Sequence, residues 1–178
     1  IAAILFGFAM PMTPVQILWI NLILAATLGL VLAFEPPEPG VMARPPRRAD
    51  SGLLTRFLAW RIVFVSVLFM ALSLAMFFWT LGRGNDLAYA RTMVVNLLVV
   101  LEIFYLFSVR YLHMTSFTLT GVKGTGPVLG AVGIVVAAQL AFTYLPLMQV
   151  IFGSVPISVA DGLVIVVVGA LSMAFLEV

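Results

Sequence analysis

Two polar side chains lie inside long apolar stretches of the chain. Glu102 occurs in VVNLLVVLEIFYLFSVR, and Asn21 occurs in VQILWINLILAATLGL. A carboxylate at the centre of a bilayer costs roughly 2.5–3.5 kcal/mol on insertion scales. Carboxylate and amide oxygens are also ligands for hard cations. Asn21 and Glu102 are therefore candidate metal ligands in a cation or proton path, and Tyr105 joins them because it shares a helix face with Glu102.

Each of these residues also has a purely structural interpretation. Glu102 would then be a protonated or hydrogen-bonded carboxyl that ties helices together, and Asn21 would make an interhelical hydrogen bond. Asn96 precedes Glu102 by six positions, which places the two about 120° apart on an ideal helix. We therefore do not expect Asn96 to share a ligand shell with Glu102.

The remaining polar residues of the apolar stretches favour packing or solvation. Gln139 and Thr143 are four positions apart, and this spacing indicates hydrogen bonds between helices. Asp161 and Glu177 occur close to the ends of the last apolar stretch. We expect both carboxylates to be solvated at the membrane interface.

The elements that would position these residues are membrane-spanning helices. Hydrophobic residues make up 63% of the chain and charged residues 9%, whereas about a quarter of an ordinary soluble domain is charged. A spanning helix needs about 20 apolar residues, and no alternating barrel pattern occurs. The sequence predicts an all-α, polytopic transmembrane bundle in one domain, 1–178. Its expected helices are 1–10 (a half-segment), 15–34, 53–82, 87–109, 127–145 and 157–176.

Basic residues predict how the bundle is oriented. Cytoplasmic connections of membrane proteins are enriched in Lys and Arg. Most basic residues of this chain lie in or beside two connections, 35–52 and 110–126, and only Arg83 and Arg91 flank the opposite side. The two connections and the C-terminus are therefore expected in the cytoplasm. The sequence predicts a multi-pass integral protein of the plasma (inner) membrane.

Several classes of function are excluded by what the sequence lacks. It has no cysteine and one histidine, so it has no thiolate site and no zinc site of its own. No Gly-rich phosphate loop and no HExxH motif occurs, and the net charge of +2 gives no basis for nucleic-acid binding. The chain also starts within an apolar run. We expect a piece of a longer protein that is not catalytic alone and holds no cofactor itself.

The stretch from Pro11 to Arg48 reads PMTPVQILWINLILAATLGLVLAFEPPEPGVMARPPRR. It resembles the sixth-helix region and following cytoplasmic loop of type II P-type ATPases, the relatives of calcium and sodium–potassium pumps. The matching positions are Gln16, Leu18, Trp19, Asn21, Leu22, Glu35, Pro36, Pro37, Met42, Arg44, Pro45, Pro46 and Arg47. A weaker resemblance continues through TMVVNLLVVLEIFYLFSVR and YLPLMQVIFGSVPIS to the end of the chain.

The resemblance implies the end of helix five followed by helices six to ten of a pump. It implies ATP-driven cation translocation, with Asn21 and Glu102 as ligands from the sixth and eighth helices. ATP and Mg²⁺ would serve the full-length enzyme. The partners implied are the lipid bilayer, the transported cation, and the upstream helices and cytoplasmic domains of the same pump. A coupling loop would contact the phosphorylation domain through Glu35, Pro36, Pro37, Arg44 and Arg47.

One departure from the family pattern bears on the ion. In calcium and sodium pumps the asparagine is followed by L-x-T-D, but here Leu24 and Ala25 replace the threonine and the aspartate. A divalent cation in a low-dielectric site needs compensating carboxylates. We therefore expect a monovalent ion, a proton, or a site that uses carboxylates from elsewhere. The alternative is a non-catalytic scaffold or anchoring domain from a divergent or degenerate pump.

Overall fold

The computed structural model describes residues 7–29, 55–110 and 126–176, together with Ala3, Leu5 and Ala33. All regular structure in these residues is helical, without a strand, which confirms the predicted all-α class. The elements are α2 (Pro14–Ile23), the π-helical segment η1 (Leu24–Gly29), α3 (Arg56–Gly82), α4 (Leu87–Arg110), α6 (Gly126–Tyr144), α7 (Pro146–Phe152) and α8 (Val159–Leu176).

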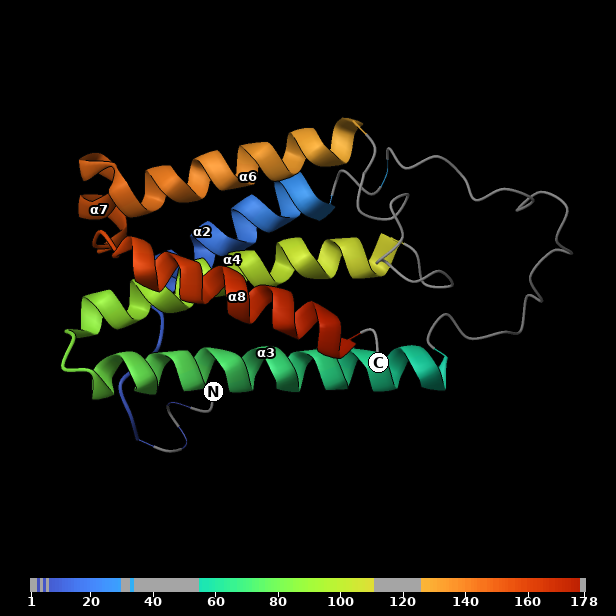
Figure 1. The fold of residues 1–178 in the computed structure, drawn as a ribbon, viewed down its shortest axis with the longest axis horizontal. Helices are drawn as coiled ribbons and strands as arrows, with labels where there is room; N and C mark the ends of the chain where they lie inside the picture. The colour runs from blue at the N-terminus through green and yellow to red at the C-terminus, as the bar shows by residue number, and fades with distance from the viewer. Residues whose placement is uncertain are drawn as a thin grey trace, which may run out of the picture.

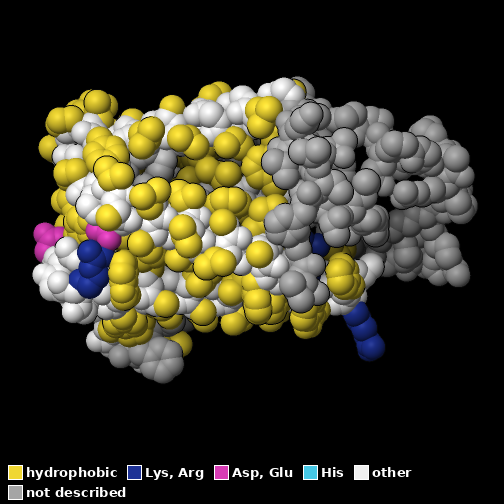
Figure 2. All heavy atoms as spheres, in the orientation of Figure 1, with side chains coloured by type: hydrophobic (Ala, Val, Ile, Leu, Met, Phe, Trp, Pro, Cys, Tyr) yellow, Lys and Arg dark blue, Asp and Glu magenta, His cyan; other side chains and the backbone are white. Residues whose placement is uncertain are grey.

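Four of these helices are long and apolar enough to cross a membrane. They are α3, α4, α6 and α8, and their bounds lie within a few residues of the predicted segments. Their outer faces carry exposed apolar side chains such as Ile134, Val159 and Leu171. Figure 2 shows hydrophobic side chains spread over the described surface, with charged side chains gathered near its ends. Such a surface is suited to lipid and not to water.

Local sequence signals explain where the helices begin. Thr13 caps α2 and forms a capping box with Gln16, while Pro14 occupies the first helical position. Thr55 caps α3 by accepting a hydrogen bond from the backbone N–H of Leu58 at 3.2 Å. Each cap satisfies backbone donors that a helix N-terminus leaves free.

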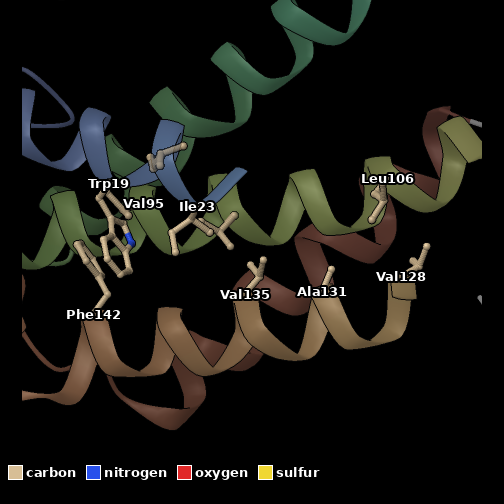
Figure 3. Packing of buried hydrophobic residues seen from close by; sticks show 10 residues of the cluster. Trp19, Ile23, Val95, Leu106, Val128, Ala131, Val135 and Phe142 are labelled. Carbon is tan, nitrogen blue, oxygen red and sulfur yellow. The ribbon is translucent and has the colours of Figure 1, made fainter. Parts of the chain in front are cut away.

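Helix α4 lies at the centre of the bundle. It packs against α3, α8, α6 and the α2–η1 unit, and Figure 1 shows these elements arranged around it. One cluster of buried side chains joins α4 to α2 and α6, including Trp19, Val95 and Phe142 (Figure 3). A second cluster joins α4 to α3 and α8 through Met76, Leu97 and Ile165, among others. The orientation of α4 is thereby fixed from several sides.

The structure differs from the sequence predictions in three places. The segment expected as one helix over 15–34 is α-helical only to Ile23 and becomes π-helical from Leu24. The half-segment 1–10 is not helical from Phe8 to Met10, after a turn at Gly7 with φ of +69°. The stretch expected as a loop from Pro146 to Pro156 contains the short helix α7.

Two predicted connections lie outside the described residues. The two connections expected in the cytoplasm, 35–52 and 110–126, fall almost wholly there. The proposed coupling loop is included, with Glu35, Pro36, Pro37, Arg44 and Arg47. Their assignments therefore stay predictions.

Candidate cation site

Glu102 lies on the face of α4 that packs in the buried cluster shared with α2 and α6. Glu102 follows Val95 by seven positions and precedes Leu106 by four, and these spacings place the three on one helix face. Val95 and Leu106 pack in the same buried cluster as Ile20 and Ile23 of α2. Glu102 itself is half-buried. Within the described residues, no hydrogen bond or ion pair satisfies its carboxylate.

Asn21 lies on a different face of α2 from the one that packs. The residues that α2 buries are Gln16, Trp19, Ile20 and Ile23. Asn21 follows Gln16 by five positions, which places it about 140° around the helix, and its side chain is exposed. No hydrogen bond joins Asn21 to Glu102 in the described part of the chain. The exposed side chain of Asn21 is therefore accessible to groups that lie outside the described residues.

A π-helical segment begins three residues after Asn21. The backbone N–H of Leu24 donates to the carbonyls of both Ile20 and Asn21 at this junction, and Ala25 in the segment is exposed. π-Helical turns are rare and occur frequently at functional sites. The small residues Ala25 and Gly29 on one face were an indirect signal, but the residues themselves did not predict a π-helical segment.

Tyr105 is engaged with helix α3. Its ring meets that of Phe69 edge to face, with centroids 6.0 Å apart. The guanidinium carbon of Arg61 lies 5.9 Å from the Tyr105 ring centroid, within the range of a cation–π contact. A cation ligand role for Tyr105 stays a prediction, and a positive charge already lies close to it.

Two interhelical hydrogen bonds confirm the packing roles predicted for Gln139 and Thr143 of α6. Asn96 of α4 and Thr143 of α6 are hydrogen-bonded at 3.1 Å, and Asn96 also donates to the carbonyl of Thr92. The side-chain oxygen of Gln139 accepts a bond from the indole N–H of Trp19 at 3.2 Å. Asn96 is therefore turned toward α6, and the expectation that it does not share a ligand shell with Glu102 agrees with this contact.

The expectation that Asp161 is solvated is wrong. Asp161 is 4% exposed and accepts hydrogen bonds from Arg83, Tyr89 and Ser158 at 2.5, 2.5 and 2.9 Å. These donors come from the end of α3, from α4 and from the residue before α8. Glu177 lies outside the described residues. The burial of Asp161 was missed because its partners Arg83 and Tyr89 are more than 70 positions away in the sequence.

The four membrane-length helices define an integral, multi-pass membrane domain. Comparison with known proteins gives its family. Residues 9–178 match the family model described as "Cation transporting ATPase, C-terminus". The chain belongs to this family, the C-terminal domain of P-type cation-transporting ATPases.

Individual relatives agree with the family match. The chain is 46% identical over 159 residues to "Probable cation-transporting ATPase F" of Mycobacterium bovis, covering 89% of this chain and 18% of the relative. It is 34% identical to "Cation-transporting ATPase pma1" of Synechocystis, covering 86% and 18%. It is 29% identical to "Calcium-transporting ATPase" of Bacillus subtilis, covering 95% and 19%. The chain therefore spans about a fifth of the length of these relatives.

Proposed function

We propose that this chain supplies part of the ion site and path of an ATP-driven cation pump. The observation that carries the proposal is the unpartnered carboxylate of Glu102 in the middle of α4. A carboxylate at this depth is costly, and the structural alternative, a carboxyl that ties helices together, requires a hydrogen-bond partner. No such partner occurs among the described residues, so a transported cation or proton is the better counterpart.

Asn21 would be a second ligand, presented from α2 just before the helix changes to π geometry. Neither residue completes a site. The described residues contain no group of three or more His, Cys, Asp or Glu side chains that would hold a metal ion. Further oxygen ligands would come from the upstream helices of the full-length pump. The ion would then be monovalent, a proton, or a divalent cation held mainly by carboxylates of those helices.

The remainder of the enzyme would provide the chemistry. ATP and Mg²⁺ would bind to cytoplasmic domains outside this chain, and phosphorylation there would drive the change between inward-facing and outward-facing states. The loop carrying Glu35 and Arg44 would pass that change to α2. The enzyme would reside in the plasma (inner) membrane.

The test uses the full-length protein in detergent or vesicles. ATP hydrolysis is measured against concentration series of Ca²⁺, Mn²⁺, Na⁺ and K⁺, and against pH. The substitution Glu102→Gln keeps the size of the side chain and removes its charge. We expect the half-activating concentration of the effective cation to rise by about tenfold or more, because hydrogen bonds and contacts to charged groups contribute about 1.5–3 kcal/mol each.

Asp86→Asn is the matched control, because Asp86 is exposed in the turn before α4 and should leave the cation dependence unchanged. Asn21→Ala provides the second test residue. If cation-stimulated hydrolysis is unchanged in both Glu102→Gln and Asn21→Ala, the scaffold alternative is favoured. If the full-length protein has no DKTG phosphorylation motif upstream of this chain, the pump hypothesis is wrong.

A further inference from the structure

Gln16 is a fully buried amide that reaches from α2 to α7. Its side chain is 0% exposed. The amide oxygen accepts a hydrogen bond from the backbone N–H of Thr13 at 3.0 Å, which completes the capping box of α2. The amide nitrogen donates to the carbonyl of Phe152 at 3.1 Å, 136 positions along the chain. A capping box needs only the first bond, so the second bond calls for another explanation.

Trp19 makes a second directional bond from the same side of α2. Its indole N–H donates to the amide oxygen of Gln139 in α6 at 3.2 Å. Because an indole N–H is only a donor, this bond also fixes which way the Gln139 amide faces. The indole ring stacks on Phe142 with centroids 5.6 Å apart and lies 5.0 Å from the ring of Phe152. Figure 3 shows Trp19 and Phe142 side by side between α2 and α6.

The partner surface on α6 and α7 is itself anchored. Phe152 is the last residue of α7, and the last carbonyls of a helix have no partner within it. The amide nitrogen of Gln16 satisfies the carbonyl of Phe152. Just beyond, the hydroxyl of Ser154 donates to the carbonyl of Phe142 at 2.6 Å, and the N–H of Val155 donates to the hydroxyl of Thr92 at 3.1 Å. The end of α7 is thus tied to both α6 and α4.

The part of α2 that makes these contacts ends close to Asn21. The last buried residue of α2 is Ile23, and the π-helical segment follows directly at Leu24. Asn21 therefore belongs to the half of α2 that is fastened to α6 and α7. The change in helix type comes immediately afterwards.

We propose that Gln16 and Trp19 are positioning residues that clamp this half of α2 to α6 and α7. The clamp fixes where Asn21 lies. The inference rests on the proposed function, because it assigns the clamp a role in holding an ion ligand. Neither clamp residue touches the ion itself.

The test compares Gln16→Met and Trp19→Phe in the full-length pump. Met has nearly the volume of Gln but no amide, and Phe keeps an aromatic ring but loses the indole N–H. We expect each variant to raise the half-activating cation concentration by about three- to tenfold, the equivalent of the one interhelical hydrogen bond that each removes, while the maximal rate changes less. The matched control is Gln149→Met, because Gln149 makes a comparable bond to the carbonyl of Thr143 at 2.9 Å and none to α2.

A residue that only stabilises the fold would lower the melting temperature without moving the cation dependence. An unchanged half-activating concentration in both variants, with an active wild-type pump, overturns the clamp. A wild-type pump without cation-stimulated hydrolysis instead rejects the proposed function, and hydrogen exchange then tests the clamp independently. Residues 17–23 should lose protection in Gln16→Met while α3 stays protected, and unchanged protection of residues 17–23 would also overturn the clamp.

Discussion

Gly169 of α8 lies directly against the ring of Phe104 of α4. A Cβ atom placed on Gly169 would come within 2.7 Å of the Phe104 ring and 2.6 Å of a methyl carbon of Val100. Small residues permit this close approach between membrane helices. Gly169 belongs to the buried stripe of α8, together with Asp161, Ile165 and Ser172.

The substitution Gly169→Ala should therefore destabilise the bundle by about 1–3 kcal/mol, the usual cost of overpacking. The measurement is thermal or denaturant unfolding of the protein in detergent. Gly162→Ala is the control on the same helix, because a Cβ there would meet nothing within 4 Å. Equal destabilisation by both substitutions would show that helix contact at Gly169 is not the cause.

Removing the charge of Asp161 should also weaken the bundle. In Asp161→Asn, Arg83 loses its ion-pair partner, and one of the two oxygens that accept from Arg83 and Tyr89 is replaced by an NH2 donor, so we expect a loss of about 1–3 kcal/mol in unfolding experiments. The loss should stay below the 3–5 kcal/mol typical of a fully buried pair, because the Arg83 side chain is 43% exposed and can turn to water. Asp86→Asn, an exposed acid at the same end, should have little effect.

The hydrogen bond between Asn96 and Thr143 should contribute modestly to the free energy of unfolding. Thr143→Val keeps the shape of the side chain and removes the hydroxyl. Interhelical hydrogen bonds in membranes average about 0.6 kcal/mol and reach about 1.7 kcal/mol, so unfolding should become easier by that amount. Thr80→Val is the matched control, because among the described residues the buried hydroxyl of Thr80 bonds only to the carbonyl of Met76 in its own helix. A larger effect for Thr80→Val would contradict this assignment.

Cysteine labelling checks the predicted orientation. This chain has no cysteine, so single cysteines can be placed in a full-length protein freed of any others. In intact cells, a membrane-impermeant maleimide should label Asp86→Cys, which lies in the turn between α3 and α4. It should label Ala49→Cys, in the connection expected in the cytoplasm, only after permeabilisation. The reverse labelling pattern would show that the bundle has the opposite orientation in the membrane.

The long helices were predictable because their apolar runs exceed what any water-soluble element needs. The start of α2 was predictable as well, since Pro11 and Pro14 break the chain there and Pro14 takes the first helical position. Helix α7 was not, because PLMQVIF is short and shows no period that separates a helix turn from an apolar loop. The π-helical segment was not predicted for a related reason, since no side-chain pattern distinguishes it from a continuing α-helix.

Within the candidate site, the sequence indicated which residues are unusual but not what surrounds them. The depth of Glu102 follows from its place in an apolar run, whereas its lack of a partner in the described residues required the positions of α2 and α3. The burial of Asp161 was missed because position near a helix end predicts solvation, and only the fold brings Arg83 and Tyr89 to it. The two bonds of Gln16 show the same limit, because one is local and foreseeable and the other spans 136 positions.

The central place of α4 has a consequence for biosynthesis. The ribosome delivers α4 to the membrane before α6 and α8 exist, so Asn96 enters lipid before Thr143 is available and Tyr89 enters before Asp161 is available. Until its later neighbours arrive, a nascent α4 therefore carries polar side chains without their interhelical bonds. Truncation of the chain after α4 should therefore leave that helix a substrate for quality-control proteases.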